Sequence, residues 1–250
     1  MSDFNRGFAR TVATDRADMS VDAGLRSFML GVYNKVGLGL VLSAALAFLT
    51  GTYAPVRDLM FRVTVDGRLA GFTPLGMVVV FAPLAVLLLS GFAMRNPTAK
   101  GAGALYWTIV SLMGASLGVV VLVYTGASIA STFLITAAAF GGLSLVGYTT
   151  KKDLTGFGSF LIIGLVGIII ASLVNMFLHM AAIAFVVNVL GVLIFSGLIA
   201  YDTQRLKMTY YQLGGESASM AVATNYGALN LYLNFINLFQ FLLSLTGSRR

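Results

Sequence analysis

Two long stretches without charged residues constrain this chain more than any other feature. Residues 101–150 and 154–201 contain no Lys, Arg, Asp or Glu, and they are 50 and 48 residues long. About 20 helical residues cross a hydrocarbon core about 30 Å thick, because each residue rises about 1.5 Å. Each stretch is therefore too long for one span and predicts two. The expected turns lie at Tyr124-Thr125-Gly126 in the first stretch and near His179 in the second.

Three shorter apolar runs each fit a single span, at residues 32–53, 73–94 and 222–245. The segments are continuously apolar, whereas a membrane strand would alternate over about ten residues, so they predict helices. The chain is 58% hydrophobic and only 10% charged, with a mean hydropathy of +0.90, whereas soluble domains are about 25% charged. The sequence thus predicts an all-α, polytopic membrane protein with about seven transmembrane helices.

The expected organisation is a cytoplasmic tail over residues 1–26, a transmembrane domain over 27–247 and a short C-terminal tail over 248–250. The first segment carries four Arg and four Asp before any apolar run, so no cleavable signal peptide is visible. That tail is either a docking peptide or a simple leader, and the leader is the favoured interpretation. In the first loop, Arg62 to Gly71 predicts a short hairpin around Asp66-Gly67.

The distribution of basic residues predicts the orientation. With the N-terminus in the cytoplasm, ten basic residues lie inside and five lie outside, which favours a cytoplasmic N-terminus and a periplasmic C-terminus. The inside residues are Arg6, Arg10, Arg16, Arg26, Arg95, Lys100, Lys151, Lys152, Arg205 and Lys207, and the outside residues are Arg57, Arg62, Arg68, Arg249 and Arg250. Since these residues are scattered among loops, the net charge of +7 does not indicate a nucleic-acid partner.

Several kinds of chemistry are excluded by composition. The chain has no Cys, which rules out disulfides and thiolate chemistry, and its single histidine, His179, cannot form a histidine metal cluster. Eight of the nine acidic residues lie outside the apolar spans, so no hydrolytic constellation can be assembled. We therefore expect neither an enzyme nor a cofactor.

Asp202 is the one acidic residue placed near membrane depth, where charge is costly and functional roles are expected. It closes an apolar run at the predicted cytoplasmic end of the sixth span. Two interpretations carry equal weight: a boundary carboxylate paired with Arg205 one turn on, or an inward carboxylate that meets Arg95 at the end of the second span.

The last span carries a polar stripe. At about 100° per residue, Tyr226, Asn230, Asn234 and Asn237 fall on one side of the helix. A polar stripe would be penalised against lipid, so this helix is expected to be central, and on the residues alone its amides are read first as interhelical hydrogen-bonding groups. Further candidates for the polar interior are Asn175, Asn188, Asn34 and Lys35, the last either snorkelling or paired.

Glycines predict close helix packing. Gly114 and Gly118 form a small-xxx-small pair in the third span, which lets another helix approach closely. The same expectation extends to Gly141, Gly142, Gly164 and Gly167.

Four motifs in order resemble the Bax inhibitor family across residues 25–247. They are YTGASIASTF at 124–133, GYTTKKDLTGFG at 147–158, AYDTQ at 200–204 and LNLYLNFINLF at 229–239. The resemblance is closest to Gram-negative members that are similar to the modulator of the membrane-bound AAA protease. It implies seven helices with a central last helix and, for some bacterial members, a pH-sensitive calcium leak.

In those members an aspartate pair on helices six and seven shares a proton, and an arginine on helix two latches to it. By position, the resemblance assigns Asp202 as the first aspartate and Arg95 as the latch, whereas Asn234 stands where the second aspartate is expected. Two coupled carboxylates titrate as a pair, and this chain has only one of them. The resemblance therefore implies a pH gate that is weakened or moved.

The leading expectation is a bacterial inner-membrane protein that leaks calcium or another cation past Asp202, Asn234 and Asn237, with Asn230 and Asn175 as a secondary polar interior. Calcium prefers six to eight oxygen ligands, so only a weak site is expected, which suits permeation. The alternatives are a modulator that binds a membrane-bound AAA protease, through the N-terminal tail for example, and a structural protein without transport. The lipid bilayer is the expected partner in every case.

Overall fold

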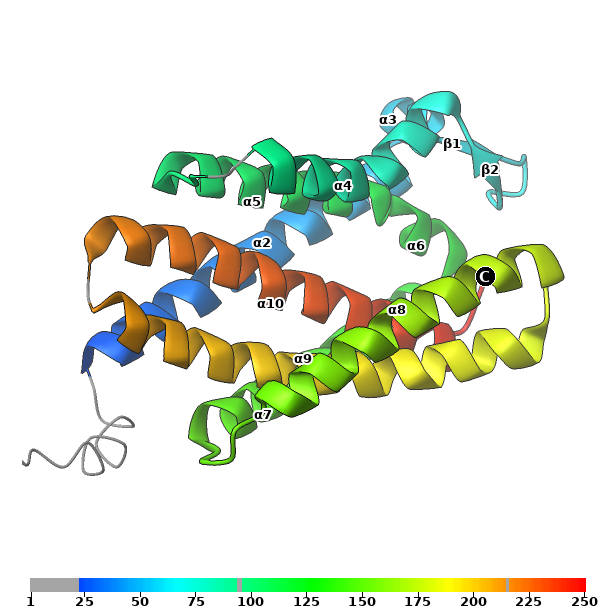
Figure 1. Ribbon diagram of the computed structural model, residues 1–250. Coiled ribbons are helices and arrows are strands. Elements are labelled where there is room, and N and C mark those ends of the chain that lie inside the picture. Colours follow the sequence, from blue (N-terminus) through cyan, green and yellow to red (C-terminus); the bar gives the residue numbers. More distant parts are fainter. Residues whose placement is uncertain (1–22, 94–95, 215) are drawn as a thin grey trace, which may run out of the picture.

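The computed structural model describes residues 23–93, 96–214 and 216–250, and within them seven helices are long and apolar enough to cross a membrane (Figure 1). They are α2 (Ala23–Thr52), α4 (Pro74–Ala93), α5 (Ala99–Ser116) continued by the short α6 (Gly118–Val123), α7 (Gly126–Thr149), α8 (Thr155–Leu178), α9 (Ala181–Leu213) and α10 (Ser217–Thr246). Both double spans turn where the sequence predicts, at Thr125 and at His179. The predicted all-α polytopic fold is confirmed.

The last helix, α10, lies at the centre of the bundle. It packs against α2, α5, α7 and α9, and Figure 1 shows it running between α5 and α9. Much of its surface is covered: Asn234 in the polar stripe is 6% exposed and Leu231 on another face is 0% exposed, while Asn230 in the stripe is exposed. The predicted central position of the last helix is therefore confirmed.

Two helices lie at the periphery. Among the described elements, α4 packs mainly on α5, and α8 packs mainly on α9. Both carry large apolar side chains that point outward, as a lipid environment requires: Phe81, Leu88 and Leu89 on α4, and Phe160, Ile163 and Phe177 on α8. Because α8 rests mainly on one neighbour, it leaves open space on its α10 side.

A hairpin and a set of turns close one end of the bundle. After α3 (Ala54–Met60), the strands β1 (Phe61–Val63) and β2 (Leu69–Phe72) pair antiparallel around Gly67, whose φ is 76°. This confirms the hairpin expected at Asp66-Gly67. At the end of the chain, the Thr125 N–H donates to the Ser248 carbonyl oxygen at 3.0 Å, so the last residues dock on the turn that follows α6.

Glycines set the spacing between α2 and the α5–α6 helix. A Cβ at Gly114 would lie 2.6 Å from Ser43 Cα, and one at Gly118 would lie 2.2 Å from Thr50 Oγ1. The close approach predicted from these two glycines is confirmed. The extension of that prediction is wrong for Gly141, Gly142 and Gly167, where nothing lies within 4 Å of an added Cβ, because no neighbouring helix comes close to these positions.

These glycines generate a stability prediction. Gly114→Ala should lower the free energy of unfolding by about 1–3 kcal/mol, because the added methyl group meets the Ser43 backbone, which cannot rotate away. The matched control, Gly142→Ala, adds the same group in open space and should stabilise α7 by up to about 1 kcal/mol. Denaturant titration in detergent micelles measures both, and equal stabilities would contradict the close packing of α2 and α5.

Candidate functional site

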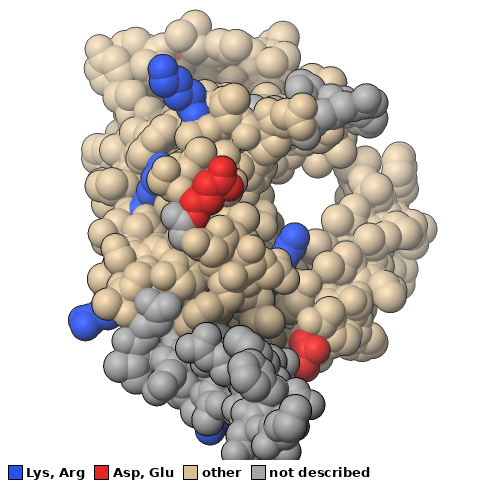
Figure 2. All heavy atoms as spheres, turned by 60° about the vertical axis from the view of Figure 1, so that its left-hand side comes forward, with Lys and Arg blue, Asp and Glu red and all other residues tan. Residues whose placement is uncertain are grey.

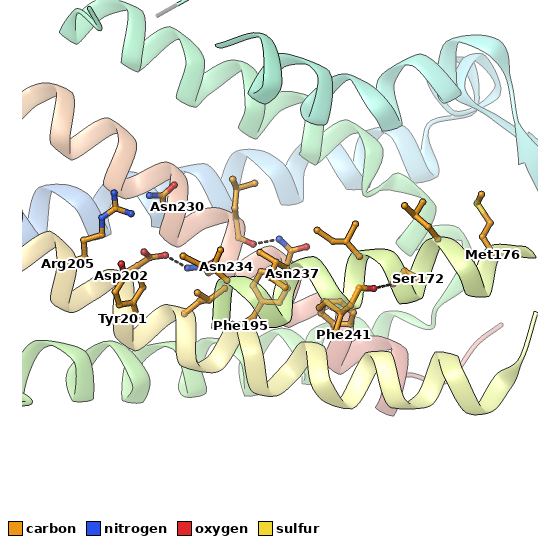
Figure 3. Close-up of a pocket in the computed structure, with 17 residues that line it drawn as sticks. Ser172, Met176, Phe195, Tyr201, Asp202, Arg205, Asn230, Asn234, Asn237 and Phe241 are labelled. Atoms are coloured by element: carbon orange, nitrogen blue, oxygen red, sulfur yellow. Dashed lines mark hydrogen bonds between the residues drawn. The ribbon is translucent and has the colours of Figure 1, made fainter. Parts of the chain in front are cut away.

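The candidate site is built around one hydrogen bond between α9 and α10. Asn234 Nδ2 donates to Asp202 Oδ2 at 2.7 Å (Figure 3). Asp202 lies where the apolar run of α9 ends, and Asn234 is the buried residue of the polar stripe of α10. The structure therefore brings together the two residues that the sequence analysis paired.

An open cavity of about 670 Å³ adjoins this pair, between α8, α9 and α10. Asp202, Asn230, Asn234 and Asn237 line its polar side. Apolar side chains of α8 line the opposite side, among them Ile162, Leu165, Ile169 and Leu173. The cavity exists because α8 makes few contacts with α10. The space-filling view shows an opening through the molecule (Figure 2).

A second, smaller cavity of about 150 Å³ lies on the other side of the carboxylate. Tyr226 lines it together with Asp202, Arg205 and Asn230. Asp202, Arg205 and Asn230 line both cavities, so the Asp202 carboxylate borders both of them. The whole predicted stripe of α10 therefore borders the space around one carboxylate.

Two arginines were expected as partners of Asp202, and the structure describes one of them, Arg205. Arg205 is exposed, and the ion pair found in the described part of the chain joins Arg57 to Asp58, not Arg205 to Asp202. The pairing of Asp202 with Arg205 therefore does not occur as a direct contact. Arg95, the expected latch, lies outside the described residues.

Oxygen atoms dominate what the site can offer a ligand. One carboxylate and the amide groups of Asn230, Asn234 and Asn237 face the larger cavity, and no group of three or more His, Cys, Asp or Glu side chains occurs among the described residues. The Asn237 amide donates to the Leu233 carbonyl oxygen at 2.8 Å, which fixes its orientation. Hard cations prefer such oxygen ligands, and so few of them hold an ion only weakly.

The other predicted polar residues lie elsewhere. Asn175 Oδ1 accepts from the Met180 N–H at 2.9 Å at the α8–α9 turn, so it shapes the turn and lines neither cavity. Asn188 Nδ2 donates to Ser244 Oγ at 2.8 Å between α9 and α10. Asn34 is exposed on α2, contrary to the expectation of a place in the interior.

A separate polar cluster on another side of α10 was only partly expected. Lys35 Nζ donates to Asn225 Oδ1, so the lysine is paired inside the bundle. Tyr106 of α5 packs against Gly39, which lies one turn after Lys35 on α2. The Tyr106 hydroxyl donates to the Lys35 carbonyl oxygen at 2.6 Å. Asn225 and Tyr106 were not predicted from the sequence, although each interrupts an apolar helix face and marks a buried contact.

A third hydrogen-bonded contact lies deeper between the same helices. Ser43 Oγ donates to the Val110 carbonyl oxygen at 3.0 Å and lies 2.6 Å from Tyr232 Oη. All three residues are buried, and Ser43 and Tyr232 line none of the cavities described. These contacts hold α2, α5 and α10 together and leave no room for a ligand.

Comparison with known proteins gives the family. A family model described as "Inhibitor of apoptosis-promoting Bax1" matches residues 25–250. An uncharacterized protein of Caulobacter vibrioides is 71% identical over 250 residues, which is 100% of both chains. The inner membrane protein YbhL of Escherichia coli is 40% identical over 231 residues, covering 91% of this chain and 94% of YbhL. An uncharacterized protein of Rickettsia prowazekii is 40% identical over 243 residues, covering 97% of this chain and 98% of the relative.

The match covers every described span and includes the motifs that contribute Asp202 and the α10 amides. The chain is an integral membrane protein of the Bax inhibitor family.

Proposed function

We propose that this protein is an inner-membrane cation leak in which ions pass Asp202 through the space between α8, α9 and α10. The observation that carries the proposal is the position of Asp202, which is hydrogen-bonded to Asn234 and borders both cavities. The inner-membrane location is supported by the printed name of the relative YbhL. Calcium is the ion to test first, because the site offers only oxygen ligands.

The chemistry of the cavity favours passage over tight binding. A conducting path must attract an ion and also release it, so sites with few ligands suit it better than a closed cage. The polar side supplies one carboxylate and three amides, with the exposed Arg205 beside them, and α8 supplies a wall with no charged group. A cation near Asp202 is therefore attracted by one carboxylate, opposed by one guanidinium and not enclosed, which favours weak binding.

Blocking the cavity tests the route. Ser172 lines the cavity and donates to the Ile168 carbonyl oxygen, and Ser159 makes the equivalent bond to Thr155 on a part of α8 outside the cavity. Ser172→Trp should reduce calcium flux at least about tenfold, because the indole ring fills the space, and Ser159→Trp should leave it unchanged. A calcium dye inside proteoliposomes measures both rates against empty vesicles.

The two outcomes against the proposal are specific. Flux no higher than that of empty vesicles from pH 5 to 8, with the protein shown to be folded, would exclude a leak. Equal flux in the Ser172→Trp and Ser159→Trp variants would exclude this route.

The pH dependence of flux is tested by exchanging the carboxylate and amide. Asn234→Asp places a second carboxylate at hydrogen-bond distance from Asp202, and two such groups titrate as a coupled pair, so the flux should depend more steeply on pH. Asp202→Asn removes the titrating group and should flatten the profile. Flux from pH 5 to 8 in proteoliposomes measures both, and two unchanged profiles would contradict a role for this pair.

The alternative function, modulation of a membrane-bound AAA protease, was predicted to use the N-terminal tail. Residues 1–22 of that tail lie outside the described residues, so the alternative stays a prediction from sequence. Co-purification of the full-length chain from native membranes tests it. Recovery of a protease that is lost when the tail is deleted would support it, and the absence of any protease would remove its support.

A further inference from the structure

A third open space lies between the start of α2 and the end of α7. It has a volume of about 580 Å³ and shares no lining residue with the cavities around Asp202. Its lining includes Arg26, Leu30 and Tyr33 from α2, and Gly141, Ser144 and Tyr148 from α7. We call this space the α2–α7 groove.

The groove is apolar along most of its length and open on its outer side. Leu30 and Leu145, on its two edges, are 51% and 62% exposed. Between them, Gly141 has no atom within 4 Å of the position that a Cβ would take, so the groove has room beside α7. Both edges belong to membrane-length helices, so the groove faces the acyl chains of a bilayer.

One buried hydroxyl of the groove has no hydrogen-bond partner in the described part of the chain. Ser144 is 6% exposed, and its Oγ is the buried side-chain polar atom without a hydrogen bond among the described residues. A buried hydroxyl without a partner is unfavourable, and serines in helices usually bond to their own backbone. Since Ser144 lines the groove, a ligand in the groove can supply the missing acceptor.

Positive charge gathers at the end of the groove. Arg26 lines its mouth with an exposed side chain, and Tyr148 lies one turn from Ser144 toward the same end. Lys207 Nζ donates to the Tyr148 carbonyl oxygen at 3.0 Å and lies 5.6 Å from the centre of its ring. Lys151 and Lys152 follow directly and are exposed.

The acidic side chain next to these lysines is already engaged. Asp153 Oδ1 accepts from both the backbone N–H and the side-chain hydroxyl of Thr155, at 2.9 and 2.6 Å. Asp153 still carries one negative charge, but Arg26, Lys151, Lys152 and Lys207 outnumber it, so the balance of charge at this end, within the described residues, is basic.

We propose that the α2–α7 groove binds one anionic glycerophospholipid from the adjacent leaflet. Its phosphate lies at Arg26 and Tyr148, an ester carbonyl oxygen accepts from Ser144, and an acyl chain runs along Gly141 between Leu30 and Leu145. A basic pocket between transmembrane helices at the cytoplasmic side is a recognised binding environment for anionic headgroups, and the orientation predicted from sequence places this end there. The apolar length of the groove selects a ligand with a chain over a small free anion. This inference does not depend on the cation leak.

Retention of lipid by the purified protein tests the charge of the site. Full-length protein in detergent is mixed with equal amounts of phosphatidylglycerol and phosphatidylcholine of matched chains, and native mass spectrometry counts the bound molecules. One phosphatidylglycerol should be retained in preference to phosphatidylcholine, and Arg26→Gln should weaken that binding about fivefold. The control Lys100→Gln removes a charge from an exposed residue at the start of α5 and should have no effect.

Two further variants test the shape of the groove and its hydroxyl. Gly141→Phe should fill the groove and abolish retention, whereas Gly142→Phe adds the same ring at the neighbouring open position outside it. Ser144→Ala should lower retention without lowering thermal stability, because the hydroxyl bonds to no described protein group. If Gly141→Phe does not fold, Arg26→Gln and Ser144→Ala decide the question alone.

Three results would overturn the proposal. The first is equal retention of the two lipids by the unchanged protein. The second is an equal effect of Arg26→Gln and Lys100→Gln. The third is displacement of phosphatidylglycerol by glycerol 3-phosphate at similar concentration, since that would show a site for a small anion and not for a lipid.

Discussion

The polar stripe of α10 is the constraint on which the rest of the fold depends. A bilayer offers no hydrogen-bond partner to an amide, so a helix with several asparagines must be enclosed by other helices. Here α2, α5, α7 and α9 enclose it, with Asn234 donating to Asp202 and Asn225 accepting from Lys35. Because α2, α5, α7 and α9 occupy the places next to α10, α4 and α8 can pack only on the outside of the bundle.

The two sides of α10 carry similar groups and differ in the space around them. Toward α2 and α5, the hydroxyls of Ser43, Tyr106 and Tyr232 are buried and hydrogen-bonded, which stabilises the packing. Toward α8 and α9, the carboxylate of Asp202 and the amide of Asn230 border open cavities. Polarity alone therefore does not identify a site in this bundle. A polar group next to an open cavity can contact an ion, whereas a polar group buried in hydrogen bonds only holds helices together.

Sequence patterns predicted the features that depend on local chain properties. The helices and both turns were predicted because hydropathy and length act within one segment, and the stripe of α10 was predicted because helical periodicity needs no neighbour. Asn175 and Asn34 were misplaced for the opposite reason: one amide bonds to the Met180 backbone and the other faces outward, and only the neighbouring helices decide this. The same holds for Gly114 and Gly142, which are alike in sequence and differ in what lies opposite. The larger cavity could not be predicted, since it exists only because α8 packs on α9 and stands away from α10.

The peripheral place of α8 has a mechanical consequence. Its main support is α9, and the turn between them contains His179 in the left-handed region with φ at 52°. A displacement of α8 would widen or narrow the larger cavity while the hydrogen bond between Asp202 and Asn234, which joins two other helices, stays intact. The width of the space and the chemistry of its polar side are thus controlled by separate elements, so a change in one does not require a change in the other.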